Sequence, residues 1–105
     1  MGIRYIEKFE PSLDGLIVAL CHDYPRRGAG SAHRRVDMEY RYINTRMLEA
    51  VTELYGERYA PALIHEIGEH IGHANSALDY TSETNYKRIK YQAKLAIARK
   101  LYLLD

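Results

Sequence analysis

Apolar residues recur every three or four positions along most of the chain, which is the period of an α-helix rather than of a strand. The first such stretch, residues 13–24, predicts a helix that begins at Ser12 or at the Glu10–Pro11 pair and stops at Pro25. The next segment, residues 25–33, has two glycines and no large apolar residue, so we expect a loop there.

The second predicted helix has the most regular apolar stripe. Its positions step by three or four residues through Tyr40, Ile43, Met47, Val51 and Leu54. Either Ser31 or Asp37 can cap its start, and Gly56 stands where a helix commonly ends in a left-handed residue. The sequence therefore fixes the end of this helix more closely than its start.

Two more helices complete the pattern. Pro61 suits the first turn of a third helix, which we expect to run to about Ala74 with Asn75 as its stop. A fourth helix begins near Thr81 or Ser82, both good N-caps, and continues almost to the end of the chain. Its predicted inner face holds Tyr86, Ile89, Ala93, Ala96, Ile97 and Leu104.

These elements predict an all-α fold, with residues 1–105 forming a single-domain bundle of about four helices around one core. Only residues 3–6, IRYI, have the composition of a short strand. No apolar run approaches the ~20 residues of a membrane span. The first twelve residues carry four charges and no signal-peptide apolar block, so we expect a cytoplasmic protein without membrane contact.

The charge is divided unevenly along the chain, although the total is only +1. Residues 81–105 contain six lysines and arginines against two carboxylates, a balance of +4, which leaves −3 for the other residues. A second basic cluster, which we also expect to bind nucleic acid, consists of Arg26, Arg27, Arg34 and Arg35. On the fourth helix, Lys87, Lys90, Lys94 and Tyr91 share one face, with Arg88 at its edge. Such a face matches a phosphate backbone, but it is also common as a plain solvated surface.

The same helix resembles a known class of regulator. Residues 82–101, SETNYKRIKYQAKLAIARKL, resemble the recognition-helix end of phage late-gene regulators of the ArpU-like type and, more distantly, region four of sigma factors. The matching positions are a serine–threonine start, aromatic and basic residues and an apolar block: Ser82, Thr84, Tyr86, Lys87, Arg88, Lys90, Ala93, Leu95 and Ala96. The segments 20–27 and 39–44 likewise resemble small prophage regulators.

The resemblance implies a helix-turn-helix-like C-terminal half in which the fourth helix enters the major groove of DNA. It implies that Ser82, Thr84, Asn85 and Arg88 lie near base edges. Lys87, Lys90, Tyr91 and Lys94 would then lie nearer phosphates. One departure is the connection: a helix-turn-helix has a turn of three or four residues, whereas residues 75–81 supply about seven.

The stretch LIHEIGEHIGHA, residues 63–74, raises the alternative of a metal site. If the third helix is continuous, His65, Glu69 and His73 fall on one face at i, i+4 and i+8. They then span roughly 12 Å, too far for one small ion to bridge all three. The zincin motif also fails, because Glu69 stands at the position of its second histidine. A solvated polar face is therefore the favoured interpretation, and we expect no cofactor.

Two enzyme interpretations rest on less. The set His65, Glu66, Glu69, His70 and His73 offers general bases or ligands. Arg58, followed by six residues and His65, is similar to the arginine–histidine pair of HEPN-type nucleases. Cys21, the only cysteine, lies in the apolar run LIVALC, which indicates a buried small hydrophobe rather than a nucleophile. We expect no enzyme activity.

Gly68 and Gly72 interrupt the third predicted helix, and each glycine costs a helix up to ~1 kcal/mol relative to alanine. We expect close approach of another backbone there, from the fourth helix or from a second copy of the chain. Ten tyrosines against one phenylalanine also suit half-buried and interface positions.

The charge layout and the resemblance together predict a small DNA-binding regulator of phage or mobile-element origin, with an oligomeric helical interaction protein as the alternative.

Overall fold

The computed structural model describes residues 10–27, 35–78 and 81–104. Within these ranges there are five α-helices, one 3-10 turn and no strand, which confirms the predicted all-α fold. The elements are α2 (Pro11–His22), α3 (Tyr24–Arg27), α4 (Arg35–Tyr55), α5 (Ala60–Gly68), the 3-10 turn η1 (His73–Asn75) and α6 (Glu83–Lys100). No described helix is both long and apolar enough to cross a membrane.

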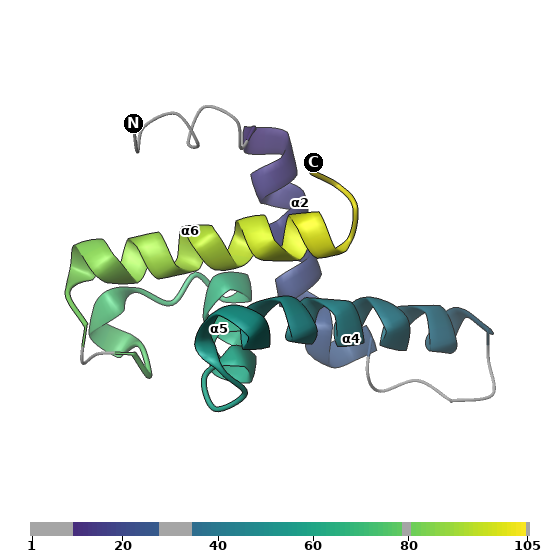
Figure 1. Ribbon diagram of the computed structural model, residues 1–105, viewed down its shortest axis with the longest axis horizontal. Helices are drawn as coiled ribbons and strands as arrows, with labels where there is room; N and C mark the ends of the chain where they lie inside the picture. Colours follow the sequence, from purple (N-terminus) through teal and green to yellow (C-terminus); the bar gives the residue numbers. More distant parts are fainter. Residues whose placement is uncertain (1–9, 28–34, 79–80, 105) are drawn as a thin grey trace.

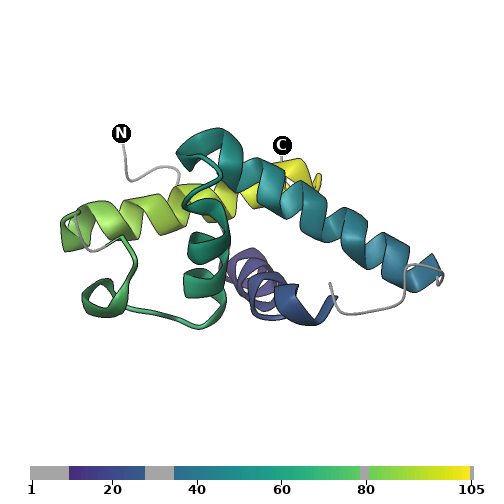
Figure 2. The same cartoon turned by 90° about the horizontal axis from the view of Figure 1, so that it is seen from below.

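The long helices α4 and α6 pack against each other, and α2 packs against both α5 and α6 (Figure 1). The view from below shows that α5 runs across α6 rather than along it (Figure 2). In both views, the first turns of α6 and the η1 segment form one end of the molecule, while the last turns of α6 lie beside α2 and α4. The two ends of α6 therefore have different surroundings.

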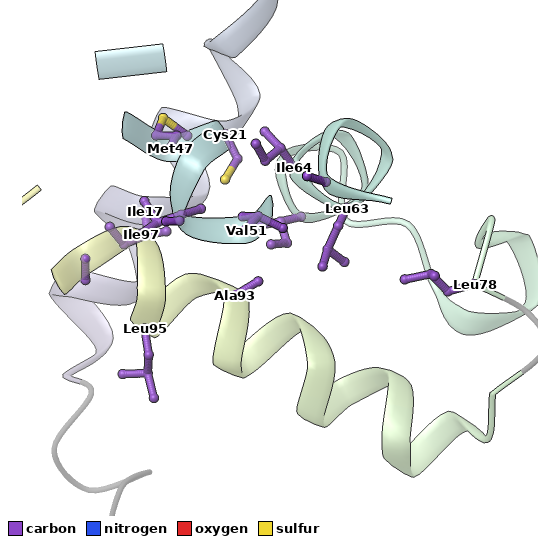
Figure 3. Close-up of a cluster of buried hydrophobic side chains, with 14 of the residues drawn as sticks. Ile17, Cys21, Met47, Val51, Leu63, Ile64, Leu78, Ala93, Leu95 and Ile97 are labelled. Carbon is purple, nitrogen blue, oxygen red and sulfur yellow. The ribbon is translucent and has the colours of Figure 1, made fainter. Parts of the chain in front are cut away.

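The core forms where the helices cross. Figure 3 shows Val51 of α4 between Ile17 and Ile97 on one side and Leu63 and Ile64 on the other. All five side chains are at most 1% exposed. At ~1.5–3 kcal/mol for each fully buried aliphatic side chain, this cluster is a main source of stability.

The first predicted helix is confirmed at its start and wrong at its end. Glu10 is the N-cap and Pro11 occupies the first helical position, as expected. However, α2 ends at His22, the chain turns at Asp23, and α3 follows at once with Pro25 in its first turn. Proline lacks only an N–H that a first turn leaves unpaired, so Pro25 does not stop the chain from becoming helical again. The predicted loop therefore does not include its first three residues, and the rest of it lies outside the described residues.

The second predicted helix corresponds to α4. Its end at Gly56 is confirmed, since Gly56 adopts φ 87 and its N–H donates to the Thr52 carbonyl at 2.8 Å. The Asp37 cap is wrong, because α4 is already helical from Arg35, and Ser31 lies outside the described residues, as does the IRYI segment. Leu54 is 49% exposed, so it does not belong to the buried stripe.

The third helix ends earlier than the sequence predicted. The helix α5 stops at Gly68, six residues before Ala74, and His70 adopts a left-handed conformation with φ 56. The N–H groups of His70 and Ile71 donate back to the carbonyls of Ile67 and Glu66, which is the Schellman arrangement that closes a helix. Glycine usually occupies this left-handed position, and because His70 stands there instead, no glycine in the sequence marks the end of the helix.

Gly68 lies where α5 crosses α2. A Cβ on Gly68 would lie 2.6 Å from the Cys21 carbonyl carbon and from the His22 nitrogen. The predicted close approach is thus confirmed at Gly68, although the approaching helix is α2 rather than α6. The prediction is wrong for Gly72, where a Cβ would have nothing within 4 Å.

Candidate functional site

The start of α6 is as the sequence predicted. The Ser82 hydroxyl caps the helix by accepting the Asn85 N–H at 3.1 Å. Glu83, in the first turn, lies 3.7 Å from the Lys87 ammonium. The first two turns hold five of the predicted DNA-binding residues, all exposed: Ser82, Thr84, Asn85, Lys87 and Arg88. The structure therefore brings these five together on one polar surface, which we call the α6 start surface.

The lysines further along α6 do not continue this surface. The Lys90 ammonium donates to the Ile71 carbonyl at 2.9 Å and lies 5.2 Å from the Tyr86 ring centre. The Lys94 ammonium lies 2.6 Å from the Asp14 carboxylate of α2, and its side chain is only 19% exposed. Burial, aided by the charge of Lys94, lowers the pKa of Lys90. These two cations hold the fold together, so the expected row of free lysines is shorter than the helical spacing implied.

Tyr91, also predicted to approach phosphates, is half-buried and packs against the hydrophobic core. Its ring is therefore only partly available to a ligand. Lys100, at the end of α6, is paired with Glu53 of α4 at 2.7 Å. Lys90, Lys94 and Lys100 are thus joined to the segments that pack against α6.

The two described arginines of the basic cluster before α4 differ in exposure: Arg26 is exposed and Arg27 is buried. Arg26 is 80% exposed in its side chain and pairs with Asp23 at 3.2 Å. Arg27 is only 7% exposed, and its guanidinium donates to the Asn44 side chain at 2.8 Å and to the Leu20 carbonyl at 2.6 Å. Arg27 therefore joins α2, α3 and α4 and is not available to a phosphate. Arg34 and the Arg35 side chain lie outside the described residues.

The histidine–glutamate stretch does not form the aligned face that a metal site needs. Because α5 ends at Gly68, His65 is on the helix, Glu69 is its C-cap and His73 is in η1. Glu69 pairs instead with His22 of α2 at 2.9 Å. Within the described part of the chain, no three histidine, cysteine, aspartate or glutamate side chains gather closely enough to hold a metal ion.

Glu66 lies inside the protein rather than on a polar face. It is 4% exposed, and its carboxylate accepts hydrogen bonds from the Ser76 hydroxyl at 2.6 Å, the Ala77 N–H at 2.8 Å and the Tyr86 hydroxyl at 2.7 Å. Burial alone would raise the pKa of Glu66, but these donors together with the Lys90 charge hold it below its ordinary value. Glu66 therefore anchors the segment after α5 to α6.

Cys21 and the pair Arg58 and His65 are the remaining chemical candidates. Cys21 is buried, and burial raises the pKa of its thiol to about 12, so it stays protonated and unreactive. Arg58 and His65 are both exposed, and the Arg58 guanidinium lies over the ring of its neighbour Tyr59 at 5.5 Å. Neither observation favours a nuclease site.

An apolar hollow that the periodic pattern did not predict lies at the other end of α6. It has a volume of about 370 Å³ and lies between α2, α4 and the end of α6. We call it the C-terminal groove and define its apolar lining as Leu16, Leu20, Tyr42, Ile43, Leu101, Tyr102 and Leu103. A neighbouring hollow of about 380 Å³ between α4 and α6 also includes Tyr102 in its lining.

Tyr102 is the most exposed large hydrophobic side chain in the described residues. It is 81% exposed and adopts a left-handed conformation, φ 61, at the residue after the cap of α6. The N–H groups of Tyr102 and Leu103 donate to the carbonyls of Arg99 and Ala98, again in the Schellman pattern. Such a conformation costs a tyrosine on the order of 1 kcal/mol, since glycine is the residue that adopts it freely.

Arg46 of α4 holds the Tyr102 ring in place. Its guanidinium donates to the Tyr102 hydroxyl at 3.0 Å and lies 5.5 and 5.7 Å from the ring centres of Tyr42 and Tyr102. A Glu49 carboxylate oxygen lies 3.7 Å from this guanidinium. Among the described residues, nothing accepts a hydrogen bond from the buried Arg46 Nε. The run LYLL, residues 101–104, was the available signal, because four successive apolar residues cannot all face one core.

No protein-family model matches the chain, and comparisons with curated proteins and with solved structures likewise give no match. The resemblance to ArpU-like regulators therefore stays a prediction. The connection between α5 and α6, residues 69–82, is longer than the one expected from the sequence and far longer than a helix-turn-helix turn.

Proposed function

We propose that this protein is a non-catalytic helical module that binds another protein chain through the C-terminal groove. One observation carries the proposal: four of the five large hydrophobic side chains that are exposed in the described residues line this groove. They are Leu16, Tyr42, Tyr102 and Leu103. Single exposed leucines are ordinary on a protein surface, whereas a contiguous set indicates a binding site.

The composition of the groove supports the same conclusion. Tyrosine and arginine are enriched in the energetically important centres of interfaces, and the rings of Tyr42 and Tyr102 both lie against the Arg46 guanidinium here. The strained backbone of Tyr102 places a large ring in water, where it contributes little to the core. A residue in a strained conformation that exposes a large ring to water is a candidate for a functional role.

Site-specific photo-crosslinking tests the proposal directly. A benzophenone amino acid replaces Tyr102 in one variant and Glu57, which is exposed at the turn between α4 and α5, in a matched control. In the cells that make the protein, we expect a discrete protein adduct from position 102 and none from position 57. The absence of an adduct from position 102, or equal adducts from both positions, contradicts the proposal.

A second candidate is nucleic-acid binding by the α6 start surface. The observation in its favour is the gathering of five polar, exposed residues, with Lys87 and Arg88 among them, at one end of the molecule. Two available cations predict a weak, salt-dependent affinity, with a slope of log K against log salt of about −2. A free row of four or more would give a steeper slope.

A titration of fluorescent duplex DNA at several salt concentrations tests this candidate. The double variant Lys87→Ala/Arg88→Ala removes the surface cations, and Arg58→Ala removes an exposed cation elsewhere as the control. We expect the double variant alone to lose binding. If the wild-type chain does not bind at ~20 mM salt, or if the control loses binding equally, the candidate is wrong.

A further inference from the structure

We infer that the chain bound in the C-terminal groove is a second copy of the same protein, arranged about a two-fold axis. Tyr102 of each copy would then occupy the groove of its partner. This inference rests on the proposed function, since it names the occupant of the same site. Three features of the groove point to a copy of the chain: its shape, its charges and the area it offers.

The shape is self-complementary. A two-fold interface uses the same surface on both chains, so that surface must carry both a projection and a matching hollow. Tyr102 projects with 81% of its area exposed, and the apolar hollow of about 370 Å³ lies directly beside it. The hydrogen bond to Arg46 and the Schellman ending of α6 fix the projection, so little conformational freedom is lost on binding.

The charges in the hollow beside the C-terminal groove are also compatible with a second copy. Arg99 is exposed, and no carboxylate pairs with it in the described part of the chain. Glu53 lines the same hollow and is paired with Lys100 at 2.7 Å, and Glu49 lies 3.7 Å from Arg46. This surface therefore carries both signs, so two copies do not meet as surfaces of one sign, which would repel each other.

The exposed tyrosine side chains supply part of the area that a dimer interface buries. Tyr42 and Tyr102 together offer on the order of 250 Å² of side-chain surface, since a tyrosine buries ~150–250 Å² in full. Each partner contributes ~800 Å² to a standard interface. Leu16 and Leu103, both partly exposed, add further apolar area, and an interface that stays below the standard size predicts a dimer of moderate rather than high affinity.

Sedimentation equilibrium of the full chain tests the inference. The variant Leu16→Glu places one carboxylate per copy in the groove, at a side chain that is 45% exposed. Ala19→Glu makes the same charge change at an exposed position of α2 outside the groove lining, and serves as the control. Circular dichroism and thermal unfolding establish that both variants fold.

We expect the wild-type chain and Ala19→Glu to dimerise with a dissociation constant below about 100 µM, and Leu16→Glu to dimerise at least ten-fold more weakly, equivalent to ~1.4 kcal/mol. A wild-type chain that stays at 12.2 kDa up to millimolar concentration overturns the inference. A dimer that Leu16→Glu leaves intact overturns it as well, because the copies then meet elsewhere.

The crosslinker at position 102 separates failure of this inference from failure of the proposed function. An adduct of two identical chains supports both. An adduct with a different protein, from a chain that sediments as a monomer, overturns the dimer and retains the proposed function. A crosslink from position 102 to residues 1–9 of the same chain overturns both, because the groove then has an internal occupant.

Discussion

Substitution of Gly68 by alanine gives the sharpest test of how α5 and α2 pack. Its added methyl group would lie 2.6–2.7 Å from the main-chain atoms of Cys21 and His22. A flexible side chain could rotate away from such a contact, but a helical backbone cannot. The two helices must therefore separate or tilt, and the core residues Ile17, Ile64 and Ile67 lie next to this crossing.

The magnitude follows from two opposing effects. Alanine gains up to ~1 kcal/mol over glycine in helix propensity. Overpacking costs typically ~1–3 kcal/mol and more where the contact is with backbone. Because the contact is with backbone, the overpacking cost lies at the upper end of this range or above it, and we expect Gly68→Ala to lower the free energy of unfolding by a net ~2 kcal/mol or more, a large part of the ~5–15 kcal/mol of a small domain. The melting temperature should fall by more than ~8 °C.

The assay is urea unfolding followed by circular dichroism, with Gly15→Ala as the control. Gly15 lies inside α2, and a Cβ there would have nothing within 4 Å. The control should gain ~0.5–1 kcal/mol from helix propensity alone. If Gly68→Ala unfolds within ~0.5 kcal/mol of the wild type, the close crossing of α5 and α2 described above is incorrect.

Three further predictions concern buried polar groups. Glu66→Gln should destabilise the protein by ~1–3 kcal/mol at pH 7 in chemical unfolding, because three donors lose a charged acceptor. Glu69→Gln at the surface should cost less than ~0.5 kcal/mol, and equal losses would contradict the assignment of Glu66 to the interior. Since the folded pKa of Glu66 is lowered, its contribution is complete above the unfolded pKa near ~4.3 and is lost as pH falls through the lower folded pKa, so stability measured from pH 6 to pH 2 should show less of an acid loss in Glu66→Gln than in the wild type. Arg27→Gln should destabilise the protein by ~2–4 kcal/mol and Arg26→Gln by less than ~0.5 kcal/mol in the same urea assay, and the reverse order would place the wrong arginine inside. The Cys21 thiol, with a pKa raised by burial to about 12, should react with Ellman's reagent at pH 8 only as fast as the protein unfolds; rapid reaction of the native chain would show that the thiol is accessible.

Local signals account for the parts of the fold that the sequence predicted well. Ser82 caps α6, Pro11 begins α2 and Gly56 ends α4 because each residue acts on its own turn of backbone. The end of α5 depended on His70 taking a conformation that glycine normally takes. A periodic pattern continues past such a residue, so the prediction ran on to Ala74.

The site residues were harder to predict because their roles depend on distant partners. Lys94 was placed on an outer face of its helix, but Asp14, eighty positions earlier in the chain, pairs with it. Glu66 was considered only as a candidate base or ligand, because the donors that hold its carboxylate inside the protein stand ten to twenty residues further on. Leucine at helical spacing usually indicates a core position, and for that reason the exposed Leu16 was not recognised as part of a groove.

Two-dimensional NMR of ¹⁵N-labelled protein at about 50 µM and about 1 mM tests the central claim at the level of single residues. The account predicts that concentration-dependent shifts concentrate at the backbone amides of Leu16, Tyr42 and residues 101–104, which surround the C-terminal groove. Shifts centred instead on residues 82–88, or identical spectra at both concentrations from a chain that sediments as a monomer, would contradict the account of the C-terminal groove as the surface on which two copies of this chain meet.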